Sequence, residues 1–121
     1  MDLLSRGRNS LNNDEIGAIT KSIRKYFFGN NLIRTVCRDD EIWMVFSDVC
    51  RALGYANSRD QFKKLPDEVR TKVDVLAKNT LVGGVNKAGL YRFCTLSDKS
   101  QARELYAWAK DKQIFEDYDG R

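Results

Sequence analysis

The chain has 121 residues and 42% hydrophobic content, which is enough for one core and excludes large two-lobed enzymes. With 21 Lys and Arg against 17 Asp and Glu, the net charge is +4, so affinity for a polyanion has to come from a local patch. Histidine is absent, which excludes histidine-based catalytic triads and histidine-containing zinc sites. We therefore expect no catalysis, no metal site and no cofactor.

Three isolated cysteines, Cys37, Cys50 and Cys94, cannot by themselves close a four-ligand zinc site. Their odd number argues against a disulfide framework and favours a reducing compartment. No stretch reaches the roughly 20 apolar residues that span a bilayer, and the first residues lack the apolar core of a secretory signal. We expect a soluble protein of the cytoplasm or nucleus, without a membrane partner.

A polar arm and a helix are the first elements expected along the chain. Residues 1–13 are polar and contain an Arg-Gly-Arg run, so we expect a flexible arm that precedes a single domain over 14–121. Apolar residues then recur at near-helical spacing as far as Phe27, and Gly29 follows as a stop signal. This pattern predicts an amphipathic helix over 14–28.

The segment 31–46, NLIRTVCRDDEIWMVF, alternates in both of its halves. Ile33 and Cys37 lie on one side of the first half, and Ile42 and Phe46 lie on one side of the second. The polar run RDDE between the halves is typical of a turn. The segment therefore predicts a β-hairpin with a half-buried face.

Two short helices are predicted after the hairpin. Ser47 is an N-cap candidate, and Gly54 is typical of the position just beyond a helix end. Ser58 with Gln61 three residues later forms a capping-box pattern, and Pro66 ends the second helix.

Asp48 and Cys50 in the first of these helices admit two interpretations. They could begin a catalytic site, but a catalytic cysteine needs a nearby base and the chain has no histidine. We favour the structural interpretation, in which Asp48 is a helix-start residue and Cys50 a small buried hydrophobe.

The second half of the chain predicts further strands and two more helices. A period-two stretch around Val73 and a Gly83-Gly84 turn indicate strands that extend the sheet. Segments 86–96 and 97–115 place apolar residues at helical spacing. The order of elements implies an α+β fold: a small single domain with a β-hairpin and antiparallel sheet packed against several short helices.

Three runs occur in the order of a known family: WMVFSDVCRALGY, NKAGLYRF and SDKSQARELYAWAKDK. Over roughly 33–115 the chain resembles the Bro-N domain, the N-terminal domain of the baculovirus repeated open reading frame proteins. That domain is found also in poxviruses, other large DNA viruses and phage antirepressors. The resemblance implies a DNA-binding domain, often joined to a variable C-terminal domain, that acts on viral or host transcription and replication. It places the protein in the cytoplasm or nucleus of a host cell.

Two features depart from the family pattern. The family usually continues after the tryptophan helix into a proline and a basic segment, whereas this chain carries Glu116, Asp117 and Asp119. These carboxylates would repel phosphate, so we assign them no DNA contact. Ala88 stands at a position that is often acidic in the family.

The candidate nucleic-acid-binding residues lie mainly in and after the second short helix. The two helices with their tight connection could resemble a helix-turn-helix, whose second helix enters the major groove. The cations of this region are Arg59, Lys63, Lys64, Arg70 and Lys72. The alternative is that they solvate an exposed face. A second candidate patch comprises Lys21, Arg24 and Lys25, and a third comprises Arg6 and Arg8 of the arm.

Other residues offer further alternatives. Arg34 and Arg38 on the hairpin could enter a major groove as part of a two-stranded ribbon. Arg92 fits an ion pair as readily as a ligand contact. The aromatic residues that could stack on bases are Trp43, Tyr55, Tyr91 and Trp108, with core packing favoured for the two tryptophans.

Two functions of different classes follow. The leading hypothesis is a non-enzymatic viral DNA-binding module, with double-stranded DNA as its first expected partner and single-stranded DNA as an alternative. The second hypothesis is a protein-interaction module that inhibits or sequesters a host or viral regulator. A homodimer is a further candidate assembly.

Overall fold

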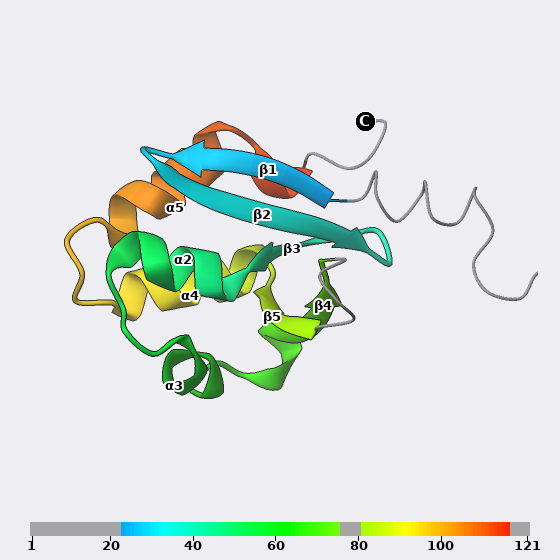
Figure 1. Cartoon of the computed structure of the whole chain (residues 1–121), viewed down its shortest axis with the longest axis horizontal. Coiled ribbons are helices and arrows are strands. Elements are labelled where there is room, and N and C mark those ends of the chain that lie inside the picture. The colour runs from blue at the N-terminus through cyan, green and yellow to red at the C-terminus, as the bar shows by residue number, and fades with distance from the viewer. Residues whose placement is uncertain (1–22, 76–80, 117–121) are drawn as a thin grey trace, which may run out of the picture.

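Antiparallel strands form one sheet in the order β1-β2-β3-β5-β4 in the computed structural model, which describes residues 23–75 and 81–116 (Figure 1). The strands are β1 (Ile23–Phe28), β2 (Asn31–Arg38), β3 (Glu41–Val45), β4 (Arg70–Asp74) and β5 (Leu81–Val85). The helices are α2 (Phe46–Leu53), α3 (Ser58–Lys63), α4 (Lys87–Leu96) and α5 (Ala102–Asp111), with short 3-10 turns at Asp67–Val69 and Ile114–Glu116. The expected α+β fold is confirmed.

Tight two-residue turns join the first three strands. Asp39 and Asp40, between β2 and β3, have φ of 55° and 63°, the pair of positive values that a type I′ turn requires. Gly29, between β1 and β2, has φ of 61°, which suits the first central position of a type II′ turn. The expected β2–β3 hairpin is therefore confirmed.

The helix expected over 14–28 is wrong where the structure describes it, because Ile23–Phe28 forms strand β1. This strand pairs antiparallel with β2 over its whole length. Alternate side chains of the strand turn toward the helices, where Tyr26 and Phe28 meet the ring of Trp108 edge-on. Over so short a stretch, the pattern of apolar and cationic residues fits both the helical period of about 3.6 residues and the strand period of 2. Pairing with β2 therefore decided that this segment is a strand. Residues 14–22 of the expected helix lie outside the described residues.

The helices after the hairpin are confirmed, although α2 begins two residues and α3 one residue before the expected position. Val45 rather than Ser47 is the N-cap of α2, and it makes no side-chain capping bond. Asn57 rather than Ser58 caps α3, where its side-chain oxygen accepts a backbone N–H. Gly54 ends α2 with φ of 84°, as expected of a left-handed C-terminal residue.

The strands expected after Pro66 are confirmed, but the Gly83-Gly84 turn is wrong, since both glycines lie within β5. A Cβ on Gly83 would lie 2.9 Å from two ring carbons of Phe62. The absent side chain at Gly83 therefore lets the Phe62 ring of α3 lie directly on the β5 backbone.

The core lies between one face of the sheet and helices α2, α4 and α5 (Figure 1). Phe46 at the start of α2 stands at its centre, with ring centroids 4.8 Å from Phe93 and 5.5 Å from Phe62. Helix α3 differs from the others because none of its residues is buried, and it lies at the periphery of the fold. A helix with so little burial leaves its side chains available to solvent or to a partner.

Candidate functional site

Four of the five cations expected around the second short helix gather at one surface hollow of about 510 Å³. We call this the cationic hollow; it is lined by Arg59, Phe62, Lys63, Asp67, Arg70, Thr71 and Lys72. Helix α3 and strand β4 build it from opposite sides. Among the described residues that line it, Asp67 supplies the one carboxylate against four cations. The hollow is therefore suited to an anion.

Arg70 has a structural task in this hollow. Its guanidinium donates a 2.7 Å hydrogen bond to the carbonyl oxygen of Phe62 and a 2.8 Å bond to a carboxylate oxygen of Asp67. The side chain thereby joins the end of α3 to β4. Since Asp67 already neutralises it in part, Arg70 contributes less free charge than the sequence indicated.

Arg59, Lys63 and Lys72 are the accessible cations of the hollow. Arg59 and Lys63 are exposed, and within residues 23–75 and 81–116 neither has an ion-pair partner. The ammonium group of Lys72 lies 5.6 Å from the centroid of the Phe62 ring, which is a cation–π distance. All three can contact a phosphate without first breaking a salt bridge to a described residue.

Lys64 lies apart from the other four cations. It follows α3 and lines a smaller hollow of about 150 Å³ on another side of that helix, together with Arg92. Arg92 is exposed and lacks an ion-pair partner in the described part of the chain, so of the two alternatives for this residue the ion pair is not formed there. The structure therefore divides the expected cluster into two groups on either side of α3.

The second candidate patch is separate from the cationic hollow. Arg24 and Lys25 lie on β1, which forms the sheet edge opposite to β4. Lys21 and the arm residues Arg6 and Arg8 lie outside the described residues. The structure does not bring this patch together with α3.

The hairpin arginines are both engaged within the fold. Arg34 donates 2.9 Å hydrogen bonds from its backbone N–H and its guanidinium to the carboxylate of Asp48. Arg38 donates to the carbonyl oxygen of Lys72 and to the hydroxyl of Thr71, and so ties β2 to β4. Both guanidinium groups are therefore engaged within the fold, whereas the ribbon interpretation required them to be available for contact with a major groove.

The structural interpretation of Asp48 and Cys50 is confirmed. Asp48 has an exposed fraction of 0% and accepts bonds from Arg34 and Arg51. Burial alone would raise the pKa of this carboxyl, but the hydrogen bonds from the two arginines outweigh burial and hold the pKa below its usual value. Burial raises the pKa of Cys50 to about 12, so its thiol is unsuited to act as a nucleophile.

The four aromatic residues named as base-stacking candidates are distributed over different regions. Both tryptophans are half-buried; Trp108 packs against the core, as expected, whereas Trp43 is not among the described residues that pack against it. The hydroxyl of Tyr55 is hydrogen-bonded to that of Ser97. Tyr91, with 54% of its surface exposed, is the most accessible of the four. None of them lines the cationic hollow.

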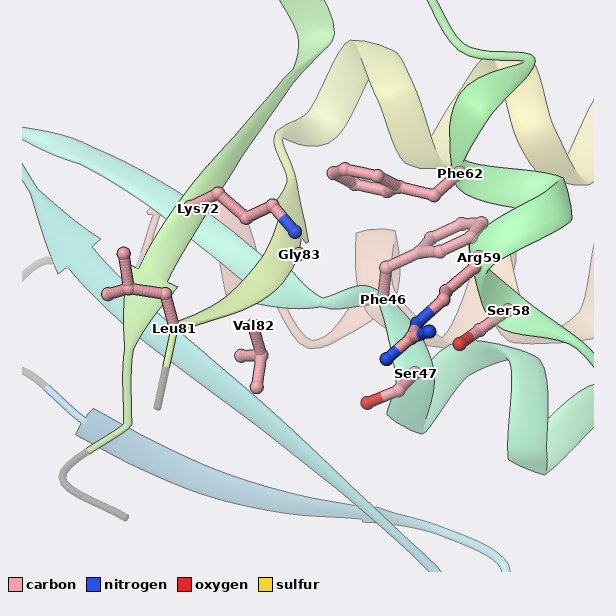
Figure 2. A pocket seen from close by; sticks show the side chains of 9 residues that line it. All are labelled: Phe46, Ser47, Ser58, Arg59, Phe62, Lys72, Leu81, Val82 and Gly83. Atoms are coloured by element: carbon pink, nitrogen blue, oxygen red, sulfur yellow. The ribbon is translucent and has the colours of Figure 1, made fainter. Parts of the chain in front are cut away.

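A second cavity of about 260 Å³ adjoins the cationic hollow and was not expected from the sequence. We call it the aromatic cleft; its lining residues are Phe46, Ser47, Ser58, Arg59, Phe62, Lys72, Leu81, Val82 and Gly83 (Figure 2). Gly83 of β5 was its signal in the sequence, because a glycine within a strand often marks close approach by another group. Spacing alone could not identify Phe62 as that group.

Some classes of site receive no support from the described residues. Within 23–75 and 81–116 no cluster of three Cys, Asp or Glu side chains could hold a metal ion. In the same ranges, no helix has the length and apolar character needed to cross a membrane.

Comparison with protein families identifies a family for most of the chain. The family model described as BRO family, N-terminal domain, matches residues 32–115. The matched segment runs from β2 to the last 3-10 turn and contains both the cationic hollow and the aromatic cleft. No curated protein and no solved structure gives a significant match.

Proposed function

The chain belongs to the BRO family by its N-terminal domain, and on this premise we propose that it is a non-enzymatic DNA-binding module. The observation that carries the proposal is the cationic hollow, where Arg59, Lys63 and Lys72 form no salt bridge with any residue that the structure describes. Such cations neutralise phosphates and release counterions, which favours binding of low sequence preference and steep salt dependence. Double-stranded DNA is the first expected ligand.

The position of α3 supports contact with both walls of a groove. Cations lie on two sides of this exposed helix, with Arg59 and Lys63 toward the cationic hollow and Lys64 beside Arg92. A helix that enters a groove has phosphates on either side, so both groups of cations can contribute. In this proposal the module acts on viral or host transcription or replication by occupying DNA.

Fluorescence anisotropy of a labelled random-sequence duplex, measured over a range of salt concentrations, tests the proposal. The double variant Arg59→Ala with Lys63→Ala should reduce the slope of log affinity against log salt by about 2, roughly one for each lost phosphate contact. The control is Lys110→Ala with Lys112→Ala, which removes the same charge from exposed positions at the end of α5. An equal reduction of this slope in both double variants would refute an interface localised at α3.

A protein-interaction module is the second candidate function, and one hollow favours it. Leu96 and Tyr91 on α4 are exposed by 75% and 54%, and they border a hollow of about 420 Å³ with Pro66 and Val69. Exposed apolar side chains of this kind are common at protein interfaces. If the duplex does not bind at low salt, the substitution Leu96→Asp, checked by capture of partners from infected-cell extract, becomes the next test.

A further inference from the structure

The aromatic cleft separates the β4–β5 hairpin from helices α2 and α3 (Figure 2). Lys72 and Leu81 stand on the hairpin side, and Arg59 extends from the helical side (Figure 2). The rings of Phe46 and Phe62 lie between them and pack against each other with centroids 5.5 Å apart. The cleft thus combines an aromatic floor with a cation on each side.

The charges of the cleft select an anion. Arg59 and Lys72 both line it, and none of the described residues that line it is acidic. Neither cation forms a salt bridge within the described ranges. Two cations that border one cavity repel each other, and an anion placed between them removes this repulsion.

The apolar part of the cleft selects a ring. Gly83 lies against the Phe62 ring, and Leu81 and Val82 form an apolar wall beside them. Inorganic phosphate would leave this surface unused. A volume of about 260 Å³ is slightly below the roughly 300 Å³ at which pockets for drug-sized ligands begin, so the cleft suits one small ring system with a short charged substituent.

We propose that the aromatic cleft is a binding site for a nucleoside phosphate, with the base on the Phe46–Phe62–Gly83 floor and the phosphate between Arg59 and Lys72. The hydroxyls of Ser47 and Ser58 line the same cavity and have no hydrogen-bond partner among the described residues. They supply donors and acceptors for the edge of a base or for a sugar hydroxyl. A free nucleotide and a nucleotide within a strand share this chemistry.

Binding in the cleft would compete with duplex DNA. Arg59, Phe62 and Lys72 line both the aromatic cleft and the cationic hollow, so a phosphate in one draws on the cations of the other. This competition rests on the proposed function, whereas the nucleotide site itself does not.

An NMR titration of the isotope-labelled chain tests the site, with deoxyadenosine monophosphate as the probe. We expect saturable shifts of the backbone amides of Val82, Gly83 and Ser58. Inorganic phosphate, which has the anion without the base, and uncharged deoxyadenosine, which has the base without the anion, are the control ligands. Each should bind at least tenfold more weakly than deoxyadenosine monophosphate. Equal binding of inorganic phosphate would overturn the proposal, because the floor would then contribute nothing.

Two leucine variants separate the cleft from general surface effects. Leu81→Ala removes part of the apolar wall and should weaken nucleotide binding about threefold to tenfold. Leu96→Ala, which shortens another exposed leucine that lies outside the cleft, should leave nucleotide binding unchanged. Weaker nucleotide binding in both variants, or in neither, would contradict the assignment of the site to the aromatic cleft.

A second ligand, a short single-stranded oligonucleotide, distinguishes a site for free nucleotides from a site for a nucleotide within a strand. If deoxyadenosine monophosphate fails but a short single-stranded oligonucleotide shifts the same amides, the site takes a nucleotide of a strand. If neither ligand shifts them, the proposal is wrong. Duplex binding measured by anisotropy in the same samples shows separately whether the proposed DNA-binding function holds.

Discussion

The carboxylate of Asp48 completes the hydrogen bonding of Arg34 at the point where β3 ends. The β2–β3 pairing stops at Thr35↔Met44, and the next N–H of β2, that of Arg34, donates to Asp48 on α2 instead of to a strand. The guanidinium of Arg34 bonds to both oxygens of the same carboxylate. A single side chain thereby joins the hairpin to the first helix.

Asp48→Asn should destabilise the fold by about 2–4 kcal/mol, because a buried ion pair loses one charge while the partner stays in place. The free energy of unfolding in urea measures the effect. Asp98→Asn, at an exposed position without a partner in the described ranges, is the control and should change stability by less than about 0.5 kcal/mol. A similar small change in both variants would show that the Asp48–Arg34 pair is dispensable.

The same pair predicts how stability depends on pH. The pKa of Asp48 is lower in the folded chain than the ordinary value of 3.8, so its contribution is present above that value and is lost as pH falls through the folded pKa. Urea unfolding at pH 7, 5 and 3 should show the difference between wild type and Asp48→Asn narrowing at the lowest pH. A difference that stays constant would contradict the lowered pKa.

Arg70→Ala and Lys63→Ala should separate structural from binding roles within the cationic hollow. Arg70→Ala removes the bonds that hold the end of α3, so we expect a loss of about 1–3 kcal/mol in unfolding free energy. Lys63→Ala should leave stability within about 0.5 kcal/mol and lower the salt slope of DNA binding by about 1. A loss of stability in Lys63→Ala would contradict this assignment, because the Lys63 side chain is exposed and has no ion-pair partner among the described residues.

Gly83→Ala should destabilise the domain by about 1–3 kcal/mol, because the new methyl group would overlap the Phe62 ring. Combining it with Phe62→Leu should cost less than the sum of the two single changes, since the smaller side chain makes room. Urea unfolding of the wild type, the two single variants and the double variant gives the four free energies of this double-mutant cycle. Strict additivity would mean that Phe62 moves away from Gly83 without cost.

Cys50 and Cys94 should resist alkylation in the native protein at neutral pH. Both are buried, and burial raises the pKa of each thiol to about 12, so little thiolate forms. Iodoacetamide labelling followed by mass spectrometry should modify both cysteines in urea and neither in buffer. Rapid labelling in buffer would reveal local opening of the core.

Much of the fold follows from local patterns in the sequence. Alternation over 31–46 predicts the β2–β3 hairpin, and the polar residues Asp39 and Asp40 occupy its turn. Gly54 marks the end of α2, where the left-handed backbone favours glycine. These features depend on residues close together in the chain, and so do the runs that carry the family resemblance.

The tertiary structure decided what depends on distant partners. Ile23–Phe28 suits either a helix or a strand until pairing with β2 and contact with Trp108 make it a strand. Arg59 and Arg70 are equivalent cations in the sequence, yet Asp67 and the Phe62 carbonyl engage Arg70, whereas Arg59 has no ion-pair partner in the described part of the chain. Charge and hydrophobic pattern are local properties, whereas the free energy of a contact depends on which groups the fold brings together.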